Sequence, residues 1–166
     1  MNKAIMLLLV TVFFSCQNNP DKKETKPNSS KEQKTDSITT TEIKKDLLSK
    51  GFQIFDYVDD KTKDTILMQQ YYMAFLKSGP SKSQTKQELD SLQKLHLGHL
   101  SRMYEMGYAD ISGPFGDNGE IRGITIYNVP TFEMADSLAN LDPMVKAGRL
   151  EIEIHPWWAA KGYPLR

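Results

Sequence analysis

The sequence is poor in cysteine, because Cys16 is the only one in 166 residues. The folded part therefore has no intramolecular disulfide and must be held by its core. It also lacks an excess of charge of either sign: Lys and Arg total 21, Asp and Glu total 21, and the pI is near 6.8. No basic stripe with interleaved aromatic residues is present. This balance argues against a surface that binds nucleic acid or another polyanion.

A long apolar run is also missing, but a short one begins the chain. Lys3 precedes the apolar residues 4–14, which are followed by Ser15 and Cys16. This run is shorter than the roughly 20 residues of a membrane-spanning helix and is typical of a secretory signal. Its end resembles a bacterial lipoprotein signal, in which the cysteine is lipidated and becomes the first mature residue. We therefore expect an exported protein anchored to a bacterial membrane through lipid on Cys16 and facing the periplasm. A plain cleaved signal followed by an incidental thiol is the alternative.

The composition predicts four segments. Residues 1–15 are the expected signal peptide of the lipoprotein type. Residues 16–41 are almost free of apolar side chains, so they cannot offset their ordering entropy and are expected to form a disordered tether. Residues 42–65 are an N-terminal extension with a short helix and a candidate extra strand. Residues 66–166 are the main domain.

The first part of the folded region alternates between a helix signal and strand signals. A mostly polar helix is expected over residues 42–50, ended by Gly51, which tolerates a left-handed cap. Residues 52–58 are the candidate extra strand. The run at 66–76 has apolar side chains on both alternating faces. A strand of this kind is expected to be central, with both faces covered.

Thr85 and Glu88 form a capping-box pattern for a long helix that reaches about Met106 and is closed by Gly107. One face of this helix is marked by residues that recur every three or four positions: Leu89, Leu92, His96, His99 and Met103.

The rest of the chain predicts three strands and one helix. A strand over residues 108–112 should stop at Gly113-Pro114, and Asp117-Asn118-Gly119 should form a tight hairpin with positive φ before a strand at 120–129. Thr131 can cap a helix over residues 133–140. A last strand with one polar face begins at Leu150.

The predicted order of strand, helix, strand, strand, helix and strand is the ferredoxin-like βαββαβ pattern of the α+β class. Both helices lie on one face of such an antiparallel sheet. Because the central strand is apolar on both faces, the other face needs a cover, and a second copy of the same sheet is the simplest one. We therefore expect a homodimer.

The folded region resembles the YCII-related (YciI-like) domain family from about Tyr71 to Trp157. The resemblance rests on four short motifs in a fixed order: His96-Leu97 eleven residues before Gly107, Gly113-Pro114, Asp142-Pro143 with Val145, Ala147 and Gly148, and Pro156-Trp157. The resemblance implies a ferredoxin-like domain paired as a dimeric α/β barrel. It also implies a site at a shared histidine and aspartate, which correspond to His96 and Asp142, while His99 lies outside the pattern.

The chemistry of these two residue types fits proton transfer. A histidine exchanges protons near neutral pH, and a carboxylate on its other nitrogen fixes the tautomer and stabilises the imidazolium. The structural alternative is a satisfied core histidine at His96 and a helix N-cap at Asp142, followed by proline at the first helical position. A metal site at His96, His99 and His155 is a weaker alternative, since no recognised ligand spacing is present.

Two functions remain open at the level of sequence. The first is an acid-base enzyme of the lyase or isomerase type that acts on a small organic molecule, with His96 as proton acceptor, Asp142 as its orienting partner and no cofactor. The second is a non-catalytic ligand-binding or interaction module of the cell envelope. Covalent acyl chemistry and nucleotide-dependent chemistry have no support, because the sequence contains no nucleophile elbow, phosphate loop or dinucleotide fingerprint.

Overall fold

The computed structural model describes residues 39–165, so the expected signal peptide, Cys16 and most of the expected tether lie outside the described residues. The elements in chain order are α1 (Thr40–Ser49), β1 (Ile54–Val58), β2 (Thr65–Ser78), α2 (Lys86–Glu105), β3 (Ala109–Pro114), β4 (Ile121–Tyr127), α3 (Phe132–Asn140), α4 (Pro143–Lys146) and β5 (Leu150–Ala160). None of the helices in this range is both long and apolar enough to cross a bilayer.

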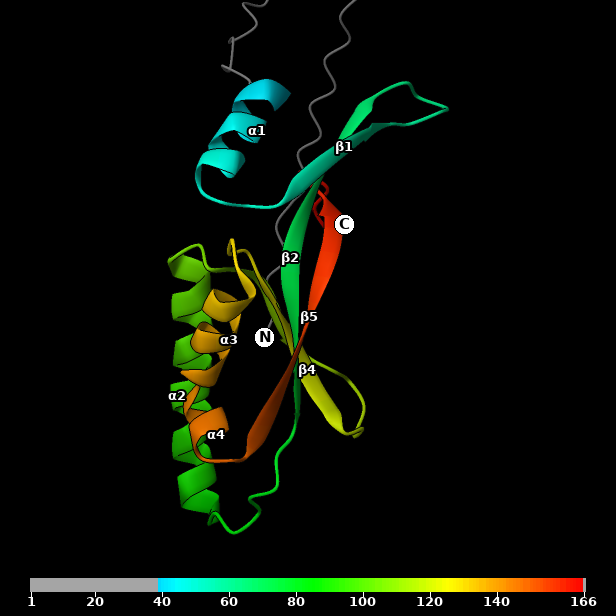
Figure 1. The fold of residues 1–166 in the computed structure, drawn as a ribbon. Coiled ribbons are helices and arrows are strands. Elements are labelled where there is room, and N and C mark those ends of the chain that lie inside the picture. The colour runs from blue at the N-terminus through cyan, green and yellow to red at the C-terminus, as the bar shows by residue number, and fades with distance from the viewer. Residues whose placement is uncertain (1–38, 166) are drawn as a thin grey trace, which may run out of the picture. The chain divides into compact units, whose positions relative to one another are not determined.

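The strands form one antiparallel sheet around β2 (Figure 1). β5 pairs with one edge of β2, and β4 and then β3 follow on the other edge. The strand order β5-β2-β4-β3, with α2 after β2 and α3 after β4, is the ferredoxin-like arrangement. The expected α+β class and βαββαβ topology are confirmed. β1 is an addition that pairs with the first part of β2, from Thr65 to Gln69.

The alternation of β2 divides its side chains between two environments. Tyr72 and Ala74 belong to the buried core under the helices, together with Met103 of α2. Figure 1 shows α2, α3 and α4 on the same side of the sheet. Met73 and Phe75 therefore point to the opposite side, because neighbouring residues of a strand face opposite ways. The prediction that this strand is central is confirmed, and its face away from the helices carries apolar side chains that are only partly buried.

The N-terminal extension begins earlier than expected. The helix α1 starts at Thr40, so the predicted tether boundary at residue 41 is two residues too late for this helix. The reason is a capping box: the Thr39 hydroxyl accepts from the Glu42 backbone N–H at 3.3 Å, and the Glu42 carboxylate accepts from the Thr39 N–H at 2.8 Å. Leu47 is buried, and Lys44 contacts Asp56 of β1 at 2.6 Å.

The expected left-handed helix ends are confirmed, whereas the expected hairpin conformation and the expected end of β3 are not. Gly51 and Gly107 have φ values of +82° and +72°, as a left-handed helix end requires. The expected positive φ in Asp117-Asn118-Gly119 is wrong, because the positive φ values of the described residues lie elsewhere. There the Asp117 carboxylate accepts from the Gly119 N–H at 3.1 Å, so the side chain closes the turn instead. β3 also continues through Gly113-Pro114, where it was expected to stop.

Candidate functional site

His96 is positioned by the buried stripe of α2. Of the twenty residues of this helix, only His96, His99 and Met103 are buried, and they follow the predicted spacing of three and four. The helix starts with the predicted capping box at Thr85 and Glu88. His96 lies in the middle of this helix, about three turns after its exposed first turn, and its side chain lies between α2 and the sheet.

Asp142 is positioned by the start of the short helix α4. Its backbone is extended, and Pro143 fills the first helical position. The backbone N–H of Met144 donates to Oδ1 of Asp142 at 2.8 Å, so this oxygen caps the helix. The predicted capping role is therefore present. The side chain is buried, with 2% of the residue exposed.

The other carboxylate oxygen of Asp142 contacts His96. Oδ2 lies 2.6 Å from Nδ1 of His96, and the two residues are 46 positions apart in the chain. An ionised carboxylate can only accept, so Nδ1 carries the hydrogen and donates. Nε2 is then the nitrogen with a free lone pair. The structure thus brings together the two residues that the sequence had singled out, and one carboxylate serves both as a helix cap and as the partner of the imidazole.

His96 lines a cleft of about 540 Å³ between α2 and one end of the sheet. Its walls come from α2, from the end of β2, from β3 and β4, and from the start of β5. Asp142 does not line this cleft. Of the pair, only the imidazole of His96 can therefore contact a ligand in the cleft. His96 itself is 8% exposed.

Two further groups of the core, Tyr127 and His99, lie close enough to Asp142 for its charge to affect their pKa values. Burial raises the pKa of Tyr127 well above its usual range, and the negative charge of Asp142 adds to this effect. Burial lowers the pKa of His99, while Asp142 acts in the opposite direction. Nε2 of His99 is buried without a hydrogen-bond partner among the described residues. Tyr127 and His99 are therefore both favoured in their neutral forms.

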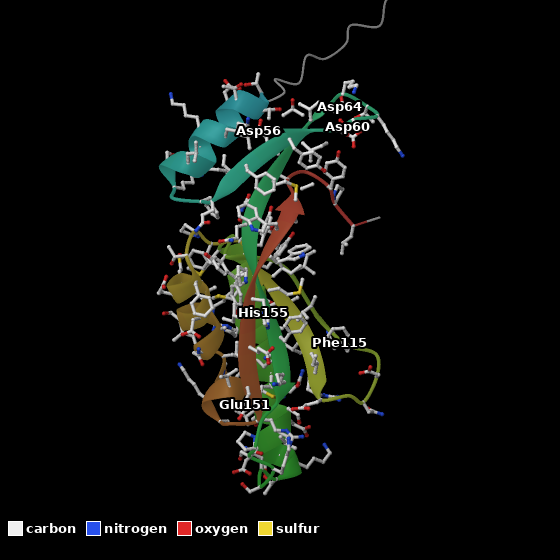
Figure 2. The ribbon with its side chains drawn as sticks, turned by 45° about the vertical axis from the view of Figure 1, so that its right-hand side comes forward. Asp56, Asp60, Asp64, Phe115, Glu151 and His155 are labelled. Atoms are coloured by element: carbon white, nitrogen blue, oxygen red, sulfur yellow. The ribbon has the colours of Figure 1, made fainter. Side chains whose placement is uncertain are left out.

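The three histidines do not meet at one point. His155 is exposed on β5, and its Nε2 lies 2.8 Å from Glu153. It pairs with Met73, on the sheet face away from the helices, where Figure 2 labels it with Glu151 of the same strand. Across residues 39–165, no group of three or more His, Cys, Asp or Glu side chains is arranged to hold a metal ion.

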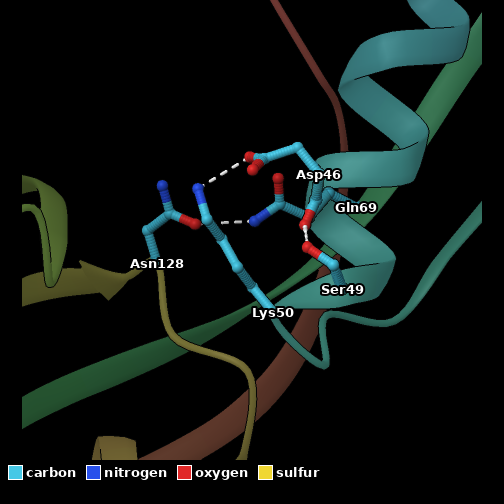
Figure 3. A network of polar contacts seen from close by, with 5 residues as sticks. All are labelled: Asp46, Ser49, Lys50, Gln69 and Asn128. Atoms are coloured by element: carbon cyan, nitrogen blue, oxygen red, sulfur yellow. Dashed lines mark hydrogen bonds and ion pairs between the residues drawn. The ribbon is translucent and has the colours of Figure 1, made fainter.

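A second polar network lies beside α1 (Figure 3). Nε2 of Gln69 donates to Oδ1 of Asn128 at 2.6 Å, and Nδ2 of Asn128 donates to Asp110 at 3.1 Å. At the end of α1, the C-cap residue Lys50 contacts Asp46 at 2.7 Å. The network ties β2 to the ends of β3 and β4, where the extension packs.

Sequence reasoning missed several residues of the site. The sequence placed Tyr127 only within the strand expected over residues 120–129. In the structure it lies opposite Tyr72 in the sheet and belongs to the core. Arg122 and Arg149 line the cleft and were not considered. The signal for both arginines is positional, since each lies at the start of a strand at the same end of the sheet.

Comparison with known proteins adds little to this geometry. No family model and no curated protein matches the chain. One similar solved structure is that of 5-chloro-2-hydroxyhydroquinone dehydrochlorinase from Burkholderia phenoliruptrix in complex with 2,5-dihydroxybenzoquinone. It is 18% identical and covers 52% of this chain and 92% of its own, with a TM-score of 0.42. This likeness is too weak to carry a functional argument, so the protein is defined here by its ferredoxin-like fold and by its own site.

Proposed function

We propose that the protein is a small acid-base catalyst in which His96 accepts a proton from an organic molecule bound in the cleft. The observation that carries the proposal is the 2.6 Å contact between Nδ1 of His96 and the buried carboxylate of Asp142, with His96 itself lining a cleft of about 540 Å³. A cleft of this size is ordinary for a small-molecule site.

The proposed step is a simple proton transfer. Nε2 of His96 takes the proton of an acidic C–H bond, and the electron pair of that bond stays on the substrate as a conjugated anion. The imidazolium is stabilised by Asp142. The proton then returns to a different atom in an isomerisation, or the electron pair expels a leaving group in an elimination. Neither course requires a cofactor.

The alternative is a non-catalytic ligand-binding module, and one observation favours it. Asp142 caps α4 as well as contacting His96, so the pair has a structural use without any chemistry. A protein of this kind would bind small molecules in the same cleft but would not move their protons.

Exchange of carbon-bound hydrogen for deuterium separates the two functions. Phenylpyruvate and the uncharged phenylacetone are incubated in D₂O with the protein, and loss of the acidic C–H signal is followed by proton NMR against a protein-free blank. The catalyst should accelerate exchange of at least one of the two compounds. His96→Gln should reduce the acceleration at least about 100-fold, the usual contribution of a general base. His155→Gln, at an exposed histidine on the other sheet face, is the matched control. No acceleration by the parent, or an undiminished rate in His96→Gln, would refute the proposal.

We also propose that two copies pair through the open face of the sheet, as in the dimeric α/β barrels of the YCII-related family. Support comes from the apolar side chains that β2 and its neighbours direct away from the helices, among them Met73, Phe75 and Ile124. Trp157, whose ring lies 6.1 Å from that of Tyr71, is 39% exposed next to them. A specific interface would bury about 800 Å² per partner.

Anchoring to a membrane is a further proposal, and it rests on the sequence of residues 1–16 alone. Cys16→Ala should release the exported protein from the membrane fraction, since no lipid could then be attached to the mature chain. Circular dichroism should show an unchanged fold. A variant that stays in the membrane fraction as fully as the parent would refute lipidation at Cys16.

A further inference from the structure

The cleft beside His96 carries an excess of positive charge. Its charged lining residues, apart from His96, are Arg122, Arg149 and Asp90. Asp90 already contacts Lys86 at 2.7 Å, so its charge is compensated at the surface of α2. Two arginines therefore line a cleft whose one lining carboxylate, that of Asp90, already forms an ion pair with Lys86.

The sheet puts the two arginines on either side of one strand end. Arg149 immediately precedes Leu150, which pairs with Ser78 at the end of β2. On the other edge of β2, Ile121 pairs with Lys77 and Gly123 pairs with Leu76, so Arg122 is the extra residue of a bulge. Bulges re-aim side chains, and they recur beside functional sites. Arg149 lies opposite Gly79, two to three residues further along β2 than Arg122. With one arginine on either side of β2, their backbones are about 12 Å apart, a span that two long arginine side chains can bridge to reach one ligand.

The two arginines differ in the hydrogen bonds and ion pairs that they already make. Within residues 39–165, no carboxylate forms an ion pair with Arg149, which is only partly exposed. Nη1 of Arg122 donates to the backbone oxygen of Gly119 at 3.1 Å, which leaves its other N–H groups available. A partly buried guanidinium without a partner is stabilised by an anion, and the planar fork of arginine matches a carboxylate.

The rest of the cleft is largely apolar. Leu89, Leu97 and Leu100 come from α2, and Leu76 and Leu150 come from the sheet. Polar groups among the lining residues include Gln93 and Ser112. The cleft thus combines two arginines and the imidazole of His96 with a largely apolar lining.

We infer that this cleft takes a small organic carboxylate with an apolar body, and that Arg149, assisted by Arg122, binds its carboxylate while His96 meets the body of the molecule. This inference rests on the proposed function, because it names the class of substrate that the same site would take. The arginines are binding residues here, and the proton acceptor remains His96.

Benzoate and benzamide form a matched pair of probes, since they share the ring and differ in charge. Each is titrated into the ¹⁵N-labelled full chain, and the amide signals of Gly113 and Gly123, two residues of the cleft wall, are followed by NMR. Benzoate should bind at least about tenfold more tightly than benzamide, the usual value of a charge-assisted hydrogen bond. Its affinity should also fall as salt is raised.

Variants assign the preference to the arginines. Arg149→Gln should lower benzoate affinity about tenfold, to the level of benzamide, and leave benzamide binding unchanged. Arg149→Lys should keep part of the preference because it keeps the charge. Lys94→Gln removes a cation from an exposed part of α2 outside the cleft and should change neither affinity. The dispersion of the amide spectrum verifies that each variant is folded.

Failure of this inference is distinct from failure of the proposed function. Equal binding of benzoate and benzamide, no binding of benzoate, or undiminished benzoate binding by Arg149→Gln would overturn the carboxylate site. The deuterium exchange of phenylacetone, which carries no charge, could still support His96 as a base. Selective benzoate binding without any deuterium exchange would support the carboxylate site and refute the proposed catalysis.

Discussion

Removing the Asp142 carboxylate should destabilise the protein more than the loss of an ordinary helix cap. In Asp142→Ala, the Met144 N–H loses its capping oxygen, which costs about 1 kcal/mol. Nδ1 of His96 is also left without its partner in a buried position, which costs about 1 to 3 kcal/mol. The free energy of unfolding should therefore fall by about 2 to 4 kcal/mol.

Asp142→Asn separates these two contributions. Its amide oxygen can still accept from the Met144 N–H, so the cap survives. The amide nitrogen then faces Nδ1 of His96 and can only donate, so the ring has to carry its hydrogen on Nε2 and accept at Nδ1. This neutral bond replaces the charge-assisted one, which should cost about 1 kcal/mol. Urea denaturation followed by circular dichroism gives both values.

Thr131→Ala is the matched control for the capping part. The Thr131 hydroxyl accepts from the Met134 N–H at 3.2 Å in an exposed position, with no histidine partner. Its loss should cost only about 1 kcal/mol. If Asp142→Ala were no more destabilising than Thr131→Ala, the buried contact between His96 and Asp142 would not exist in solution, and the reasoning would be wrong.

Four other outcomes are expected. Burial lowers the pKa of His99 below its usual 6.5, so as the pH falls the unfolded chain takes up this proton before the folded chain does. The free energy of unfolding should therefore fall on acidification, by at most about 1.4 kcal/mol per pH unit. Urea denaturation between about pH 5 and pH 8 checks this, and a His99→Gln variant with the same slope would contradict it. Thr85→Ala removes the capping box of α2 and should cost about 1 kcal/mol in the same assay; an unchanged midpoint would count against the box. Phe75→Glu should give a folded monomer by light scattering, whereas a persistent dimer would exclude the open sheet face. Burial, and secondarily the charge of Asp110, raises the pKa of Tyr71 to about 12, so ultraviolet titration of Tyr71→Phe should lack a phenol that ionises there.

Local signals made much of the fold predictable. The capping box at Thr85 and Glu88 fixed the start of α2, and the spacing of His96, His99 and Met103 correctly predicted its buried face. The double apolar face of residues 66–76 correctly predicted the central strand. These features depend on neighbours in the chain, so a sequence carries them directly.

Features that depend on register were harder to predict. The bulge at Arg122 arises where Gly123 and Ile121 pair with consecutive residues of β2, and no pattern in the sequence announces it. The contact between His96 and Asp142 spans 46 residues, and only the resemblance to a family connected the two positions. The start of α1 at Thr40 was missed for another reason, since the polar composition around Thr39 hid a capping box with Glu42.

The tautomer of His96 decides whether this residue can act as the proton acceptor, because a proton acceptor facing the cleft must leave Nε2 unprotonated. Two-bond ¹⁵N–¹H correlation spectra of the histidine rings distinguish a protonated from an unprotonated nitrogen, and His96→Gln assigns the signals. We expect a protonated Nδ1 and an unprotonated Nε2 in the free protein above neutral pH, with Nε2 shifting when phenylpyruvate is added. A ring protonated at Nε2 alone, or one whose signals do not respond to phenylpyruvate or to phenylacetone, would rule out His96 as the proton acceptor.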